Sequence, residues 1–433
     1  MTNAHRVWMV IGIAAATAGT NAHADPVLNY TLGIQAENDS NVNLSRTDPV
    51  SQNILTPELT FDVKEQGSTL TADVSGTLDY RDYLQNAFGD EFRSLLSGIV
   101  DWSISPGRFD WVFEDYLGRQ PVNVLVSNAP SNQQQTNVFS TGPTLRAHFS
   151  DTLRGKLDLR YTNTYAETST EFNGDRLSAI GQLAYLFSEQ NNIAGAIAAS
   201  QIRYDDAASR PFEYDRYDVY AGYHDETRQF KFDVAAGYSW LNFLHEADDS
   251  GPLLRGTATW APSAATSLAI NASREFSDAS QDLIVDPSQL GNLGVGSGRN
   301  GAVVSPQVYV QEQVGFDLLH SQGDFRFDVA PFWRHIDYVG GNTLNQRSSG
   351  YIATVSWLFQ PTLTFSAGAG REHRDYSDID RTDDDKAYWL GLLWQQARHW
   401  SWQFRVGNLS RASSVFEAGY SDRTYSVALT YTR

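Results

Sequence analysis

Apolar and polar residues alternate with a period of two along most of this chain. Leu70, Val74 and Leu78 share one parity, for example, and Asp73 has the other. A period of two places the two sets on opposite faces of a β-strand. The same alternation recurs from about residue 30 to residue 431 and predicts an all-β protein.

The connections between these strands alternate in length. Nine short turns, such as residues 105–107 (S-P-G), separate ten longer polar connections, such as residues 277–302. This order predicts 20 antiparallel strands with both ends of the chain on the short-turn side, and 18 strands is the alternative. Short periplasmic turns, long outer loops and an even strand number are typical of a transmembrane outer-membrane β-barrel.

The first 24 residues read as an export signal. Arg6 precedes an apolar run over residues 7–18, and Ala22 and Ala24 form a small-x-small cleavage site. The run is shorter than the ~20 residues that a transmembrane helix needs. We therefore expect a cleaved signal peptide at residues 1–24 and one barrel domain over residues 25–433. The expected location is the outer membrane of a Gram-negative bacterium.

Composition supports this interpretation and excludes some functions. Seven Trp residues lie near short turns, as a periplasmic aromatic girdle requires: Trp102, Trp111, Trp260, Trp357, Trp394, Trp400 and Trp402. The chain has no Cys, which excludes disulfides, thiolate metal sites and a Cys nucleophile. Its formal net charge of −19 argues against nucleic acid, which binds basic surfaces.

Two segments do not match a simple strand pattern. Glu312 falls on the apolar parity of its strand, which predicts a bulge or a register shift there. The acidic run at residues 375–385 (D-Y-S-D-I-D-R-T-D-D-D) reads as a long outer loop. Its carboxylates suggest calcium, but the run lacks the Gly and Glu spacing of a calcium loop, so a solvated loop is the favoured interpretation.

No catalytic set is evident. His335 and Asp337 share a strand face near an outer rim, and acid–base catalysis needs a His held by a carboxylate beside a nucleophile. Both fall on the lipid parity, however, so a surface polar pair is the favoured interpretation. We expect no enzyme activity, no metal and no cofactor.

The inward parity defines the residues expected to line the pore. These are Arg154, Lys156, Asp158, Arg160, Lys231, Asp233, Arg326, Asp328, Arg334 and Arg405, with Tyr116, Tyr220, Tyr309 and Tyr338. Mixed charges and aromatic rings suit a sugar-conducting pore, because rings stack on pyranoses. Cross-strand ion pairs that stabilise the wall are the alternative. The connections at residues 118–135 and 277–302 are candidates to fold inward as constrictions.

Several short stretches carry a resemblance to a known family. They are residues 37–44 (E-N-D-S-N-V-N-L), 137–143, 161–167 and 237–239. Together they resemble outer-membrane β-barrel proteins associated with exopolysaccharide biosynthesis and export, including those of exosortase/PEP-CTERM-type systems. The resemblance implies a protein that helps a secreted polysaccharide reach the cell surface, with periplasmic or inner-membrane export components as partners.

The expected function is therefore an outer-membrane conduit that assists export of an extracellular polysaccharide. The alternatives are a general or small-solute porin, and a structural or adhesive surface barrel with a plugged lumen. Outer-membrane lipid, lipopolysaccharide and the barrel-assembly machinery are the other expected partners. Many outer-membrane barrels end on an aromatic residue, which resembles an assembly signal, whereas this sequence departs from that pattern and ends Tyr431-Thr432-Arg433.

Overall fold

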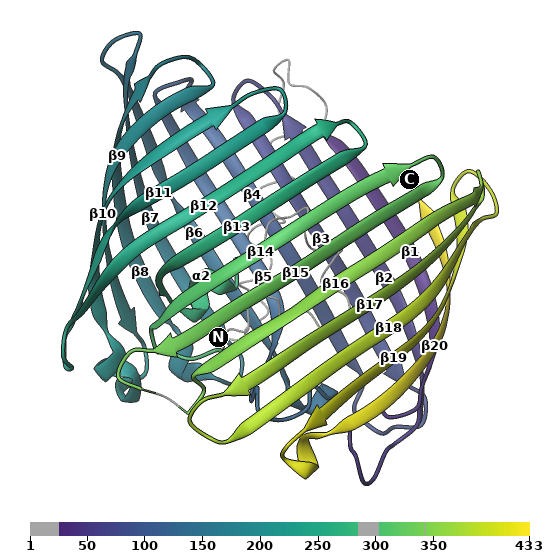
Figure 1. Cartoon of the computed structure of the whole chain (residues 1–433). Helices are drawn as coiled ribbons and strands as arrows, with labels where there is room; N and C mark the ends of the chain where they lie inside the picture. Colours follow the sequence, from purple (N-terminus) through teal and green to yellow (C-terminus); the bar gives the residue numbers. More distant parts are fainter. Residues whose placement is uncertain (1–25, 285–302, 342) are drawn as a thin grey trace.

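The protein forms a closed barrel of antiparallel strands. In the computed structural model, residues 26–284, 303–341 and 343–433 are described, so the expected signal peptide at residues 1–24 lies outside the described residues. One sheet contains 20 hydrogen-bonded strands, which confirms the predicted fold class and strand number. Figure 1 shows tilted strands arranged around a central lumen.

The strand bounds follow the predicted alternation of short and long connections. The first ten are β1 (Val27–Asp39), β2 (Gln52–Gln66), β3 (Leu70–Tyr83), β4 (Glu91–Ser105), β5 (Phe109–Pro121), β6 (Gln133–His148), β7 (Leu153–Ala166), β8 (Gly174–Leu186), β9 (Asn191–Tyr204) and β10 (Tyr214–Glu226). The others are β11 (Phe230–Phe243), β12 (Asp249–Ser263), β13 (Thr266–Ser277), β14 (Tyr309–Gln322), β15 (Phe325–Tyr338), β16 (Gln346–Gln360), β17 (Leu363–Tyr376), β18 (Arg381–Gln395), β19 (Trp400–Ser413) and β20 (Tyr420–Thr432).

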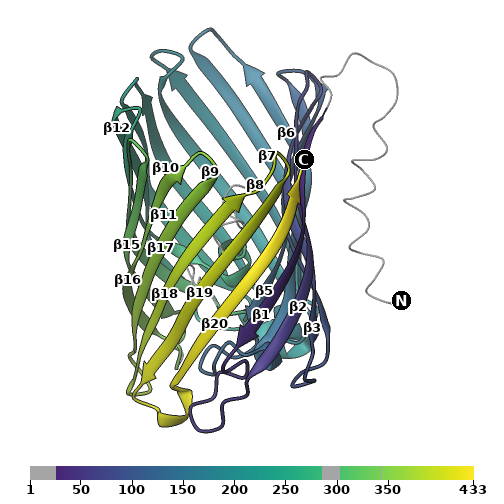
Figure 2. The same ribbon diagram turned by 90° about the vertical axis from the view of Figure 1, so that its right-hand side faces the viewer.

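Each strand pairs with its sequence neighbours, and β1 also pairs with β20. This last pairing joins Thr31–Asp39 to Thr424–Thr432 and leaves the sheet without an edge. Both described ends of the chain therefore lie at the short-turn end, whereas the longer connections gather at the opposite, long-loop end (Figure 2). Gly107 in the first hairpin after β4 has φ of 73°, a left-handed conformation that glycine adopts without strain.

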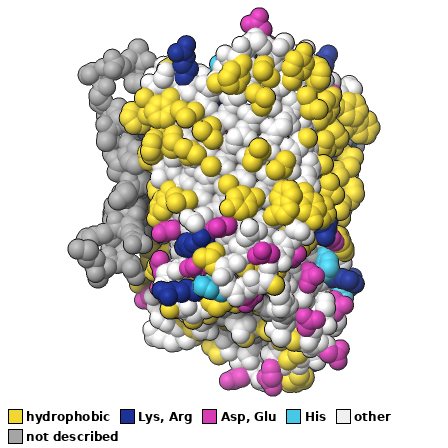
Figure 3. Space-filling model, turned by 90° about the vertical axis from the view of Figure 1, so that its left-hand side faces the viewer, with side chains coloured by type: hydrophobic (Ala, Val, Ile, Leu, Met, Phe, Trp, Pro, Cys, Tyr) yellow, Lys and Arg dark blue, Asp and Glu magenta, His cyan; other side chains and the backbone are white. Residues whose placement is uncertain are grey.

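The register separates an outer apolar face from an inner polar face. Outward residues include many large exposed hydrophobic side chains: Leu183, Tyr185, Ile193, Ile197, Phe230, Phe232, Phe325, Phe327, Leu390 and Phe404. Figure 3 shows hydrophobic side chains over the upper and middle parts of one outer face, with charged and His side chains below them, toward the long-loop end. An exposed apolar band on a closed barrel is the surface that lipid covers.

The seven Trp residues near short turns all lie on this outer face. Trp102, Trp260 and Trp400, for example, are 50%, 44% and 45% exposed. Their register partners show the same parity, since Trp102 pairs with Leu70 and Trp260 with Phe230. The placement agrees with an aromatic girdle at the short-turn end.

Glu312 does face outward, but the bulge predicted there is absent. β13 and β14 pair without a register shift from Thr266 to Ser277. Glu312 instead accepts a hydrogen bond from Arg274 Nε at 2.8 Å, and its other oxygen lies 3.7 Å from His335 Nδ1. The strands extend past the apolar band toward the long-loop end, so this acid meets partners and water rather than hydrocarbon.

The acidic run at residues 375–385 is not the long loop expected from the sequence. β17 continues to Tyr376 and β18 begins at Arg381, so only residues 377–380 connect them. Strand alternation sends Asp383 and Asp385 inward and Asp384 outward, where Asp384 pairs with Arg371 at 2.9 Å. The carboxylates therefore diverge, and the calcium interpretation of this run is wrong.

Within residues 26–284, 303–341 and 343–433, helical structure is confined to the connections. α2 (Ala279–Asp282) follows β13, and the short 3₁₀ helices are η2 (Pro130–Asn132), η3 (Thr170–Phe172), η4 (Ala207–Phe212) and η6 (Phe416–Ala418). Among the described residues, none of the helices has the length and apolarity to cross a membrane.

The lipid-facing assignment predicts unequal costs for a new charge on the two faces of one hairpin. Ile197 on β9 faces outward and is 66% exposed, whereas Gln182 on β8 lies opposite Ala196 on the inner face. Ile197→Arg should lower the free energy of unfolding in phospholipid vesicles by about 2–4 kcal/mol. Gln182→Arg, at nearly the same height, should change it by no more than about 0.5 kcal/mol. Equal effects in urea titrations would contradict the assignment.

Candidate functional site: the barrel lumen

All fourteen residues predicted to line the pore lie on the inner face. Their direct register partners on the neighbouring strands face inward as well. For example, Asp158 pairs with Thr144, and Arg334 pairs with Ser348. Ten of them are half-buried or exposed toward the lumen: Arg154, Lys156, Asp158, Arg160, Tyr220, Lys231, Asp233, Arg326, Asp328 and Arg405. Their role in conduction stays a prediction.

Many charged groups on the inner wall pair with their neighbours. On β7, Lys156 Nζ lies 2.9 Å and Arg160 Nη2 lies 3.6 Å from the Asp158 carboxylate. Between β10 and β11, Asp233 Oδ1 lies 2.6 Å from His224 Nδ1. Such pairs, within one strand on β7 and across two strands at β10–β11, are what a polar wall needs for its own stability, the alternative recognised in the sequence.

The other four predicted residues are covered rather than open to the lumen. Tyr116, Tyr309, Tyr338 and Arg334 are 6%, 0%, 3% and 2% exposed. The Tyr309 and Tyr338 rings pack edge-to-face, with centroids 5.2 Å apart. Their cover comes from connections that fold into the barrel.

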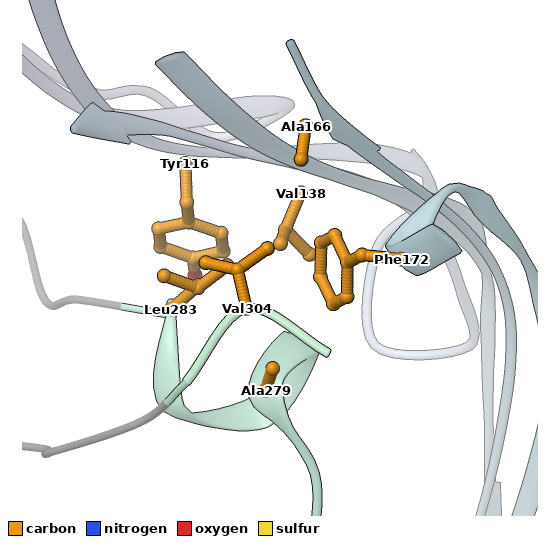
Figure 4. Close-up of a cluster of buried hydrophobic side chains, with 7 residues drawn as sticks. All are labelled: Tyr116, Val138, Ala166, Phe172, Ala279, Leu283 and Val304. Carbon is orange, nitrogen blue, oxygen red and sulfur yellow. The ribbon is translucent and has the colours of Figure 1, made fainter. Parts of the chain in front are cut away.

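The first of these is the β13–β14 segment, defined as residues 278–284 and 303–308. Although it connects β13 to β14, α2 packs against the inner face of β5, β6 and β7 (Figure 4). The contact is a hydrophobic cluster of Tyr116, Val138, Ala166, Phe172, Ala279, Leu283 and Val304. Farther along, the carbonyl of Pro306 accepts a hydrogen bond from Tyr204 Oη at 2.8 Å. The segment therefore crosses the lumen from one wall to another.

Asp278 anchors this segment by charge. Its buried carboxylate forms an ion pair with Arg176 of β8 and accepts a hydrogen bond of 2.7 Å from Tyr214 Oη of β10. Burial alone would raise the pKa of Asp278. The Arg176 guanidinium and the hydrogen bonds from Ser280 and Tyr214 outweigh burial and hold that pKa below its usual range. Asp278 is therefore ionised at neutral pH.

Asp282, one turn later, has a different environment. Its carboxyl accepts a hydrogen bond from Tyr309 Oη at 2.7 Å. Burial raises the pKa of Asp282 to about 7, although the Tyr309 hydrogen bond and the charge of Arg334 act in the opposite direction. This carboxyl therefore changes its charge near neutral pH while packed against the inner wall.

The second inward connection is the β5–β6 segment, residues 122–132. Its Leu125 carbonyl accepts a hydrogen bond of 2.7 Å from Arg381 Nη1 of β18. The Val126 carbonyl lies 3.5 Å from Arg411 Nη1 of β19. Asn132 ties the segment together by donating to the carbonyls of Asn123 and Ser127. Both connections that the sequence marked as possible constrictions thus reach into the lumen, within the described residues.

The wall that receives the β5–β6 segment carries a continuous ion-pair chain. Arg334, Glu372, Arg374, Asp385 and Arg411 follow one another across β15 to β19. The joining N···O distances are 3.3 Å from Arg334 to Glu372, 3.1 Å from Glu372 to Arg374, 3.0 Å from Arg374 to Asp385 and 2.7 Å from Asp385 to Arg411. This chain gives the long-loop end of the wall a fixed polar surface.

Within the described ranges, no group of three or more His, Asp or Glu side chains is arranged to hold a metal ion. His335 and Asp337 face outward on β15, and the charged neighbour of His335 is Glu312. They remain a surface polar pair.

Sequence reasoning missed the residues that hold the inward segments. Arg176 and Tyr214 lie on the inward parity, but alternation indicates only that they face the lumen and not which group they bind. Asp278 and Asp282 lie in a connection, where no periodicity indicates a partner. Asp385 was assigned to a loop because consecutive acids obscured the start of β18.

The comparisons with known proteins yield distant structural likenesses. No family model matches the chain, and no curated protein matches it. A ferric enterobactin receptor (PfeA) mutant from Pseudomonas aeruginosa is 11% identical, with 94% of this chain and 80% of that chain covered and a TM-score of 0.46. The siderophore receptor PirA from the same organism is 12% identical, with coverages of 96% and 81% and a TM-score of 0.46.

The outer membrane protein OpdK from Pseudomonas aeruginosa is 11% identical, with 94% of this chain and 99% of that chain covered and a TM-score of 0.41. Likenesses this distant transfer no function to the chain.

Asp278 should matter more for stability than an exposed acid. Asp278→Asn leaves Arg176 buried without its counter-charge, which should cost about 3–5 kcal/mol in the free energy of unfolding. The control is Asp215→Asn, because Asp215 pairs with Arg203 in a partly exposed outer ion pair worth about 0–1 kcal/mol. Urea titrations of the refolded barrel provide the comparison. A cost for Asp278→Asn no larger than for the control would contradict the anchoring role.

The raised pKa of Asp282 predicts a pH dependence with a definite sign. An unfolded Asp titrates near pH ~3.9, whereas folded Asp282 titrates at about 7. Between these values the folded state holds a proton that the unfolded state has lost, so the contribution to stability falls as pH rises. From pH 4.5 to pH 8 the wild type should lose about 2–4 kcal/mol more than Asp282→Asn. Parallel pH profiles for the two proteins would refute the assignment.

Proposed function

We propose that this protein is an outer-membrane channel for hydrophilic solutes whose lumen is narrowed at the long-loop end. The observation that carries the proposal is the pair of inward segments, β5–β6 and β13–β14, lodged between opposite walls. Barrels of 16–18 strands already enclose an aqueous channel, so wall side chains alone do not fill a barrel of 20 strands. The two segments occupy part of that space and select what passes.

The inner wall supports passage of polar solutes. Many of its charged groups are paired along the wall, as in Lys156–Asp158 and Arg374–Asp385. Paired charges keep the surface wetted without creating an isolated charge that traps a counter-ion. A small-solute porin needs this combination of a hydrated wall and a fixed constriction.

Polysaccharide export is a finer version of the same proposal, supported by the resemblance of the short sequence stretches. The geometry favours it less than a porin. Three of the four inward Tyr residues proposed to stack on sugars are covered. The fourth is Tyr220, whose ring centroid lies 6.0 Å from Cζ of the Arg255 guanidinium. A polysaccharide conduit would have to use other side chains.

The outer surface supports the expected lipid environment. The apolar band matches hydrocarbon, and outward ion pairs such as Arg274–Glu312 and Arg371–Asp384 lie toward the long-loop end. That end would face the head groups and sugars of lipopolysaccharide. Export components and the assembly machinery remain proposed partners on the basis of the sequence.

Replacing residues 123–131 by a four-residue Gly-Ser linker tests the channel directly. The replacement removes the acceptors of Arg381 and Arg411, while β5 and β6 can still pair as a hairpin. Single-channel conductance in planar bilayers should rise above that of the wild type. The control shortens residues 244–248, an exposed connection between β11 and β12, and should leave conductance unchanged.

The same recordings separate the alternatives. Conductance steps that neutral or acidic oligosaccharides block would favour a polysaccharide conduit, and steps indifferent to sugars would favour a porin. A folded, heat-modifiable barrel that conducts neither as wild type nor after loop replacement would overturn the proposal and favour a plugged surface barrel.

A further inference from the structure

The seam that closes the barrel carries a pair of buried acids on its inner face. Asp39 ends β1 and Asp422 lies near the start of β20, at the long-loop end. They are 8% and 4% exposed, and their carboxyl groups are close neighbours. The backbone joins the same strands beside them, because Ser40 donates its N–H to the Arg423 carbonyl at 3.0 Å.

Basic side chains do not neutralise this pair. Among the ion pairs of the described residues, none involves Asp39 or Asp422. The next acid inward on β1 is Glu37, whose carboxylate is already paired with Arg81 at 2.7 Å. Two neighbouring buried carboxylates repel each other, and either a shared proton or a cation between them relieves that repulsion.

A third buried side chain distinguishes these possibilities. Gln52, the first residue of β2, is the direct register partner of Asp39 and is 1% exposed. Neither its amide oxygen nor its amide nitrogen has a hydrogen-bond partner among the described residues. Directly opposed side chains in an antiparallel pair have Cβ atoms about 4.5–5.5 Å apart, so the amide is within reach of the carboxylates. A shared proton leaves this amide unexplained.

One oxygen of each carboxylate is already engaged by the protein. Asp39 Oδ1 accepts from the Asn41 N–H at 2.8 Å, and Asp422 Oδ1 accepts from Ser40 Oγ at 3.0 Å. These contacts fix the orientation of the two side chains. With the Gln52 amide oxygen, three neighbouring strands, β20, β1 and β2, each present an oxygen ligand.

We propose that Asp39, Asp422 and Gln52 bind a calcium ion that joins β20, β1 and β2 at the closing seam. Ca²⁺ takes carboxylate and amide oxygens in irregular geometry, whereas Mg²⁺ demands a near-ideal octahedron. The site contains two carboxylates and an amide, so it is not a cluster of three or more acidic or His side chains. It is independent of whether the barrel conducts.

The binding test uses the full mature chain refolded in micelles free of lipopolysaccharide and stripped with a chelator. Equilibrium dialysis with calcium at pH 7.5 should show one saturable site with a Kd of ~10⁻⁴–10⁻³ M, the range of extracellular calcium modules. Asp39→Asn and Asp422→Asn should each weaken binding at least tenfold. Asp328→Asn, which changes an inward acid on β15 away from the seam, is the matched control and should bind as the wild type does.

Gln52→Ala tests the ligand that distinguishes a cation from a proton. Without calcium, this variant should be as heat-resistant as the wild type, because it removes an unpaired amide. With calcium, the rise in the temperature of heat-modifiability should be smaller than in the wild type. Equal calcium binding by wild type and Asp39→Asn, or no saturable binding, would overturn the proposal and leave a proton shared by the two carboxyls.

Discussion

Every feature of this protein depends on the need to satisfy backbone hydrogen bonds inside hydrocarbon. An unpaired N–H or C=O group in lipid costs several kcal/mol, so a sheet that crosses a membrane must have no edge. The pairing of β1 with β20 meets that requirement by joining the two ends of the chain. Once the sheet is closed, side-chain alternation must place one set of residues in lipid and the other in the lumen.

Much of the fold was predictable because strand alternation is a local property. Leu157 and Asp158 are neighbours in sequence, and closure alone sends one to lipid and the other to the lumen. The same logic placed Arg154, Lys231 and Arg405 on the inner face. This logic failed where a strand continues beyond the membrane. Glu312 suggested a bulge because the sequence does not mark where the membrane ends.

The interior could be predicted only in part, since connections have no periodicity. The composition of two long connections suggested that they fold inward, but nothing in the sequence paired Asp278 with Arg176 or Leu125 with Arg381. These contacts join residues 102 and 256 positions apart. They also explain why Tyr116 and Tyr309, which alternation correctly placed inside, are covered rather than exposed to the lumen.

The two inward segments also have a mechanical meaning. A thin cylinder flattens easily into an ellipse, because bending its wall changes no hydrogen bond by much. The β5–β6 segment spans from its own strands to β18 and β19, and the β13–β14 segment spans to the wall of β5 to β10. The two segments brace the barrel from inside in two different directions. The cross-section therefore keeps its shape under lateral pressure from the surrounding bilayer.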